Sequence, residues 1–194
     1  MKNRERKQTE GEIYHIYNRG VDKRTVFSQE ADYVRFIHDL FEFNNKERAY
    51  NVSHYFSRNQ NITLQSERKP RKLVLKILAF ALMPNHYHLL LRPLKENAIS
   101  DFMQKLGGGY TRYFNEKYKR TGVLFEGKYK YVHVGDERYF LHLPYYIHAN
   151  PLKLKFPKWR EGLAVGDVPR AIEFLKKYRW SSFPDYIGHK NFPS

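Results

Sequence analysis

The sequence contains no cysteine, and none of its apolar runs is long enough to cross a membrane. Without cysteine, disulfide bonds, thiolate metal sites and cysteine nucleophiles are all excluded. The longest apolar run, Leu73–Met83, is interrupted by Lys76 and falls well short of the ~20 residues that a membrane-spanning helix needs. The basic stretch Met1–Lys7 has no apolar segment, so it does not have the pattern of a secretory signal. We therefore expect a cytoplasmic protein with no membrane partner.

Acidic residues are scarce compared with basic ones. The 194 residues include 35 Lys and Arg against 20 Asp and Glu, which gives a formal net charge of +15, and aromatic residues make up 16% of the chain. Phosphates need cations and unstacked bases need flat partners, so this mixture favours single-stranded nucleic acid as the partner. The alternative is that the basic charge serves only solubility. The length indicates one domain, with or without extensions.

Hydrophobic periodicity predicts an alternation of strands and helices. Strands are expected where polar and apolar residues alternate or short apolar runs occur, and helices where apolar residues recur every three or four positions. The expected strands cover residues 12–18, 72–82, 86–92 and 127–134, and the expected helices begin at Ser28, Ser100 and Glu137. This order predicts one α+β domain with a ferredoxin-like, RRM-like antiparallel sheet, whose centre we expect to be the second and third strands.

Three local features bear on the expected helices. Ser28 is a suitable N-cap for the first helix. Gly107–Gly109 interrupt the second helix at a cost of about 2–3 kcal/mol relative to alanine, so either the helix breaks there or a backbone approaches it closely. Pro144 lies inside the last helix, where it removes a backbone hydrogen bond and predicts a kink.

Composition divides the chain into a central domain with basic ends. We expect a basic tail over residues 1–10, the domain over 11–152 and a basic, loop-rich extension over 153–194, with a short helix near 170–178. Within the domain, residues 44–71 are polar and irregular. A structureless loop of that length is unusual in a compact domain, so the sequence predicts a mobile insertion there.

The stretch His86-Tyr87-His88 is the first candidate for a functional site. In a strand, His86 and His88 point to one face, and Tyr87 points to the other, toward the core. Two imidazoles one pleat apart can share a metal ion, and a third ligand and a reacting group must then come from elsewhere in the chain. The alternative is that both histidines are satisfied by hydrogen bonds on a half-buried strand.

The last expected helix offers both missing groups. Tyr146 and Asn150 are four residues apart, so they share one helical face. Asn150 can offer its amide oxygen to a metal held by the two histidines, and the phenol of Tyr146 then lies one turn away. A phenol, with a pKa near ~10, needs assistance to act as a nucleophile, which a divalent metal gives by polarising a phosphoryl oxygen. The spacing alone leaves open that Tyr146 is merely a core or surface aromatic.

These residues carry a resemblance to a known family. His86-Tyr87-His88 resembles the HUH motif, and Tyr146–Pro151 is similar to the tyrosine helix of the single-tyrosine HUH transposases. The pattern resembles that of the REP-associated tyrosine transposases, relatives of the small insertion-sequence transposases. Further similar stretches are Tyr14–Gly20, Gly122–Lys130 and Tyr178–Ser182, within a resemblance that covers residues 11–186. Several motifs in order at compatible spacing make the joint pattern specific.

The resemblance implies an HUH endonuclease core that cleaves and joins single-stranded DNA carrying a hairpin. Tyr146 would attack a scissile phosphate and leave a 5′-phosphotyrosine and a free 3′-hydroxyl, and the 3′-hydroxyl of another strand could reverse the step. His86, His88 and Asn150 would hold a divalent metal, Mg²⁺ or Mn²⁺. A bacterial, nucleoid-associated protein follows, as a monomer or a homodimer.

Four basic residues are predicted, from their positions, to form a DNA-binding surface around this site: Arg19, Arg112, Lys128 and Lys130. Two other hypotheses compete with the transposase. One is a catalytically inactive module that only binds single-stranded nucleic acid. The other is a metal-dependent hydrolytic nuclease, in which water attacks the phosphate and Tyr146 only positions it. Covalent capture of DNA distinguishes the transposase from both.

Overall fold

A computed structural model describes residues 8–47 and 71–192 of the chain. The predicted tail over residues 1–10 and the predicted insertion over 44–71 lie largely outside the described residues. In the part that is described, no helix is both long enough and apolar enough to cross a membrane.

One antiparallel sheet forms the centre of the molecule, with the strand order β2-β3-β1-β4. Its strands are β1 (Tyr14–Arg19), β2 (Leu75–Met83), β3 (His86–Pro93) and β4 (Lys130–His133). Helices α1 (Glu30–Glu42) and α3 (Ala98–Lys117) connect β1 to β2 and β3 to β4. This βαββαβ order on an antiparallel sheet is the ferredoxin-like arrangement. The predicted single α+β domain is confirmed.

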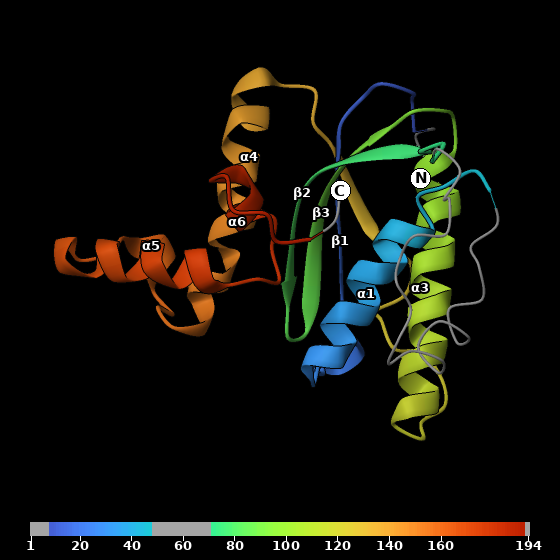
Figure 1. The fold of residues 1–194 in the computed structure, drawn as a ribbon, viewed down its shortest axis with the longest axis horizontal. Coiled ribbons are helices and arrows are strands. Elements are labelled where there is room, and N and C mark those ends of the chain that lie inside the picture. Colours follow the sequence, from blue (N-terminus) through green and yellow to red (C-terminus); the bar gives the residue numbers. More distant parts are fainter. Residues whose placement is uncertain (1–7, 48–70, 193–194) are drawn as a thin grey trace, which may run out of the picture.

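Helices cover both faces of the sheet (Figure 1). The helices α1 and α3 pack on one face, and α4 (Glu137–Ala149) packs on the other. The remaining helices, α5 (Val168–Lys177) and α6 (Phe183–Tyr186), lie on the α4 side of the sheet. Because side chains alternate along a strand, each strand contributes one set of residues to the α1/α3 face and another to the α4 face. Short 3₁₀ turns complete the chain: η1 (Val21–Lys23), η2 (Asn150–Leu154), η3 (Trp159–Glu161) and η4 (Val165–Asp167).

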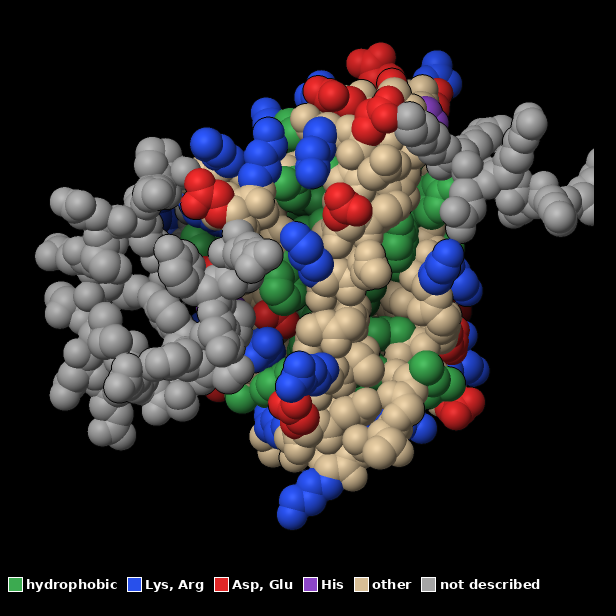
Figure 2. All heavy atoms as spheres, turned by 90° about the vertical axis from the view of Figure 1, so that its right-hand side faces the viewer, with side chains coloured by type: hydrophobic (Ala, Val, Ile, Leu, Met, Phe, Trp, Pro, Cys, Tyr) green, Lys and Arg blue, Asp and Glu red, His purple; other side chains and the backbone are tan. Residues whose placement is uncertain are grey.

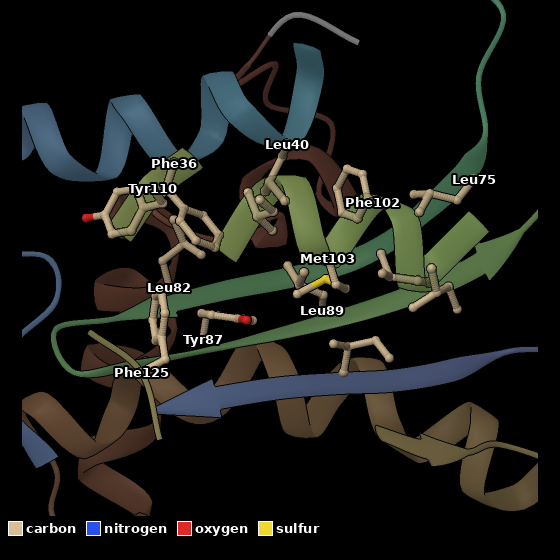
Figure 3. Packing of buried hydrophobic residues seen from close by; sticks show 14 of the residues in the cluster. Phe36, Leu40, Leu75, Leu82, Tyr87, Leu89, Phe102, Met103, Tyr110 and Phe125 are labelled. Atoms are coloured by element: carbon tan, nitrogen blue, oxygen red, sulfur yellow. The ribbon is translucent and has the colours of Figure 1, made fainter. Parts of the chain in front are cut away.

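The main hydrophobic core lies between the sheet and the pair α1 and α3 (Figure 3). Phe36 from α1 contacts Tyr110 from α3 and Tyr87 from β3, and Leu89 from β3 belongs to the same cluster; all four are buried. Full burial of an apolar side chain of this size contributes about 1.5–3 kcal/mol. The hydroxyl of Tyr110 donates to the buried carbonyl of Val26 at 2.5 Å, so its polar end is also satisfied.

The first helix begins at Glu30 rather than at Ser28. Its N-cap is Gln29, which forms a capping box with Asp32, while the Ser28 backbone N–H donates to the Asp32 carboxylate at 2.9 Å. Asp32 also accepts hydrogen bonds from Lys117 and Tyr118 at the end of α3, at 2.6 and 2.7 Å. The expectation of a Ser28 cap was wrong because the carboxylate of Asp32 takes the backbone donors at this end.

The second helix continues without a break through Gly107–Gly109. A Cβ atom at Gly109 would lie 3.1 Å from the Phe43 ring, whereas Gly107 and Gly108 have nothing within 4 Å. A side chain, rather than a backbone, therefore approaches the helix at one of the three glycines. Buried Met103, Leu106 and Tyr110 on either side of the glycines hold the helix against the sheet and offset their cost.

The centre of the sheet is formed by β3 and β1, and β2 lies at an edge. The expectation that β2 and β3 form the centre was therefore wrong for β2. The apolar character of β2 has another cause, because the C-terminal segment covers its free edge. Leu82 N–H donates to the Trp180 carbonyl at 2.9 Å, and Ser182 N–H donates to the Phe80 carbonyl at 3.0 Å. The predicted short helix of the extension is present as α5.

Candidate active site

The two histidines of β3 lie on the face of the sheet that α4 covers. In the sheet register His86 is opposite Arg19 and Met83, and His88 is opposite Tyr17 and Ala81. The two imidazole centroids are 5.2 Å apart. Tyr87 points the other way and is only 1% exposed. The alternation expected from the sequence is therefore present.

The ring of His86 is oriented by its neighbour Asn85 in the β2–β3 turn. The Asn85 amide nitrogen donates to the Lys23 carbonyl at 3.1 Å, which turns the amide oxygen toward His86. His86 Nδ1 lies 2.7 Å from that oxygen and donates to it. Nε2 of His86 therefore carries the lone pair that a metal ion requires.

The ring of His88 is held by His15 on the adjacent strand β1. His88 Nδ1 and His15 Nε2 are 2.9 Å apart in a buried contact, and the two rings stack. A metal-binding His88 keeps its hydrogen on Nδ1 and donates it to His15. The sequence analysis did not single out His15. The alternating pattern of β1 places His15 on one face of the strand. The sequence alone did not show which strand lies beside β1, so the contact with His88 could not be predicted.

All three imidazoles are neutral at neutral pH. Burial lowers the pKa of His15 to about 4. Burial, together with the positive charges of Lys153, Arg19 and Arg160, lowers the pKa of His86 to about 4. Burial also places the pKa of His88 well below its usual value. Neutral rings are the form that coordinates metals.

Tyr146 of α4 packs against this cluster. Its ring centroid lies 5.8 Å from that of His88 and 6.3 Å from that of His15. Tyr145, by contrast, is 74% exposed. The helix has this register because Leu143 and Ile147 are buried against the sheet. The helix runs through Pro144 as one element, with Asp136 as its N-cap.

Asn150 follows the last turn of α4 and is buried. Its amide nitrogen donates to the Tyr146 carbonyl at 2.8 Å, so its amide oxygen is the atom that could bind a metal ion. Two imidazole nitrogens and one amide oxygen could hold a divalent ion, and the nitrogen ligands favour Mn²⁺ over Mg²⁺ in affinity. Among the described residues, no cluster of three or more His, Cys, Asp or Glu side chains is available for a metal ion. A metal in this site would thus depend on Asn150 and on oxygens from substrate or water.

A further residue at the site, Arg160, comes from the turn η3 in the C-terminal extension. Its Nη2 donates to the phenol oxygen of Tyr146 at 2.9 Å and lies 3.5 Å from the amide oxygen of Asn150. Sequence reasoning missed Arg160, because nothing in the sequence distinguished it from the many other basic residues of the chain.

The four basic residues predicted to surround the site lie on two faces. Arg19 and Lys130 share the α4 face with the histidines, according to the strand register. Arg112 and Lys128 line a cavity of about 970 Å³ beside α3, on the other face. Figure 2 looks onto that face, where Lys and Arg side chains lie along the molecule. Lys128 precedes β4, so it lies outside the strand that the sequence predicted over residues 127–134.

The family comparison concerns the segment that contains this site. Residues 57–150 match the family described as Transposase IS200 like. This segment contains His86, His88, Tyr146 and Asn150. The resemblance of the motifs to the insertion-sequence transposases is confirmed over these residues. None of the curated proteins matches the chain in sequence.

Two solved structures are similar to this one. A REP-associated tyrosine transposase bound to a REP hairpin has a TM-score of 0.55 and 12% identity, over 100% of this chain and 89% of that chain. A candidate transposase from Deinococcus radiodurans R1 has a TM-score of 0.42 and 18% identity, over 76% of this chain and 95% of that chain. At these identities the first comparison shows a common fold, and the second is too distant to support an argument.

Proposed function

We propose that this protein is a transposase that acts as a metal-dependent endonuclease and strand transferase on single-stranded DNA, with Tyr146 as its nucleophile. One observation carries the proposal. The ring of Tyr146 packs 5.8 Å from that of His88, whereas the adjacent Tyr145 is 74% exposed. A nucleophile must lie beside the groups that bind the scissile phosphate, and only Tyr146 of the two meets this requirement.

The reaction is a transesterification at phosphorus. The phenol oxygen of Tyr146 forms a bond to the scissile phosphorus while the bond from phosphorus to the 3′-oxygen breaks. The phenol proton passes to solvent, and the departing 3′-oxygen takes up a proton. The products are a 5′-phosphotyrosine and a free 3′-hydroxyl, and the 3′-hydroxyl of a second strand joins DNA by reversing these steps.

His86, His88 and Asn150 would hold the divalent metal, either Mg²⁺ or Mn²⁺. The metal, when bound, supplies Lewis-acid stabilisation of the charge on the phosphate. The imidazole ligands favour Mn²⁺ in affinity. Asn85 accepts from Nδ1 of His86, and His15 can accept from Nδ1 of His88, so that each ring would present Nε2 to the metal.

The proposed substrate is a single strand that carries a hairpin. The formal charge of +15 supports a nucleic-acid partner, and the solved relative of the same fold is bound to a REP hairpin. Arg19 and Lys130 share the face of the histidines, where they can bind the backbone near the scissile phosphate. Arg112 and Lys128, on the opposite face, would bind a second segment of the DNA.

The test is incubation with end-labelled, hairpin-bearing single-stranded DNA and Mn²⁺, followed by a denaturing gel. We expect a protein–DNA adduct that mass spectrometry maps to Tyr146. Tyr146→Phe should abolish the adduct and retain the fold, whereas the matched control Tyr145→Phe should retain both. Cleavage without an adduct would instead support the hydrolytic nuclease, and binding without cleavage would support the inactive module.

A further inference from the structure

We propose that Arg160 is a catalytic residue of this site, which orients the phenol oxygen of Tyr146 and binds the phosphate that this oxygen attacks. The inference rests on the proposed function of Tyr146. It also assigns a direct part in the reaction to the C-terminal extension, which supplies Arg160 through the turn η3.

The contacts of Arg160 converge on the reacting group. Nη2 donates to the Tyr146 phenol oxygen at 2.9 Å and lies 3.5 Å from the amide oxygen of Asn150. The guanidinium carbon lies 5.1 Å from the centroid of the Tyr146 ring and 5.4 Å from that of Trp159. Because the phenol oxygen accepts this hydrogen bond, its own hydrogen is free to leave as the oxygen attacks.

The charge of Arg160 is not neutralised by a carboxylate. Several other arginines are ion-paired, including Arg19 with Glu126, Arg112 with Glu116 and Arg170 with Asp167. In residues 8–47 and 71–192, no such ion pair involves Arg160. An exposed guanidinium of this kind, next to a nucleophile that attacks phosphate, is suited to an anion.

The geometry of a guanidinium suits each stage of the reaction. Its five N–H groups form a planar fork, and the contacts with Tyr146 and Asn150 use only those on Nη2. The remaining donors can bind the non-bridging oxygens of the scissile phosphate, in the bidentate manner typical of arginine. When the phenol oxygen becomes part of the phosphotyrosine, the same phosphate stays beside the guanidinium.

The test is single-turnover cleavage with saturating DNA and Mn²⁺, together with DNA affinity measured in the Tyr146→Phe background. We expect Arg160→Gln to slow cleavage by about 10²–10³-fold, the usual effect of removing one donor to a developing negative charge. DNA affinity should change by less than about threefold, since one phosphate contact among many is lost. Arg160→Lys should recover part of the rate, because it restores the charge without the fork.

Lys158→Gln is the matched control, since it removes one positive charge from the same segment, and it should cleave at the wild-type rate. Equal loss of cleavage rate in the Lys158 and Arg160 variants would overturn the inference. A loss of cleavage rate in Arg160→Gln that is matched by an equal loss of DNA affinity would overturn it as well. Faster cleavage by Arg160→Gln would also overturn it, because Arg160 would then restrain Tyr146. If the wild-type protein forms no adduct at all, the proposed function itself fails.

Discussion

Each of the two imidazoles on β3 is held through its Nδ1 atom by a different neighbour. Asn85 accepts from His86 at 2.7 Å, and His15 contacts His88 at 2.9 Å. These partners fix the ring orientations, and a hydrogen on each Nδ1 would leave both Nε2 atoms as the proposed ligands. Removing a partner of this kind from a metal-binding histidine typically weakens metal binding by about 10–100-fold.

The first prediction concerns His15. His15→Phe keeps an aromatic ring of similar shape but removes the acceptor of the His88 Nδ1–H, in a place that is only 5% exposed to solvent. We expect Mn²⁺ to bind about 10–100-fold more weakly, as measured by electron paramagnetic resonance with single-stranded DNA in the Tyr146→Phe background. Tyr17→Phe, on the same strand and face, is the control. Unchanged Mn²⁺ affinity in His15→Phe would show that His15 is only a packing residue.

Local periodicity was enough to predict some of the candidate site. The alternation of the strand placed His86 and His88 on one face, and the helical spacing of Asn150 selected Tyr146 over Tyr145. Arg160 could not be predicted in this way, because its contact with Tyr146 depends on how the chain turns after the helix. No pattern of residue spacing encodes such a turn.

At the scale of elements, the C-terminal segment completes the sheet rather than merely following it. Residues 180–182 pair with β2, and the Ser182 hydroxyl accepts from the Phe80 N–H at 2.9 Å and contacts His148 of α4 at 2.7 Å. Periodicity predicted the strands, the helices and their order. It could not identify the edge strand, because β2 is as apolar as an interior strand when another segment covers its edge.

The packing of α1 against α3 depends on a buried carboxylate. Asp32 accepts hydrogen bonds from Lys117 at 2.6 Å, Tyr118 at 2.7 Å and Tyr113 at 3.1 Å. Burial raises the pKa of Asp32, but hydrogen bonds from Lys117, Tyr118 and the Gln29 backbone outweigh it, so the pKa lies below its ordinary value. The charged form of Asp32 therefore stabilises the folded state.

Asp32→Asn should lower the free energy of unfolding at pH 7 by about 1.5–3 kcal/mol, because it removes the charged acceptor of the hydrogen bonds from Lys117 and Tyr118. The stabilisation by Asp32 is present above the pKa of the unfolded chain and is lost as the pH falls through the lower folded pKa. The difference between wild type and variant should therefore shrink at pH 3. Urea unfolding at both pH values measures it, and exposed Asp101→Asn is the control. A difference that persists undiminished below the folded pKa would contradict the assignment.

At the scale of the whole molecule, positive charge dominates the surroundings of the proposed metal ligands. The chain carries a formal charge of +15, and Lys153, Arg19 and Arg160 are close enough to lower the pKa of His86. The proposed ligands are two neutral imidazoles and one neutral amide, with no carboxylate among them. A divalent cation in this setting lacks the negative charge that usually holds it. The phosphate of a bound DNA strand is the group that can supply this charge.

Metal and DNA should therefore bind cooperatively. In the Tyr146→Phe background, which prevents cleavage, we expect single-stranded DNA to raise the affinity for Mn²⁺ by more than about tenfold. Since coupling between two ligands is reciprocal, Mn²⁺ should raise the affinity for DNA by the same factor. Electron paramagnetic resonance measures the first effect and fluorescence anisotropy measures the second. His86→Ala in the same background is the control, because it retains the basic surface and reports Mn²⁺ that binds only to the DNA. Equal Mn²⁺ affinity with and without DNA would show that His86, His88 and Asn150 hold the ion without help from the phosphate.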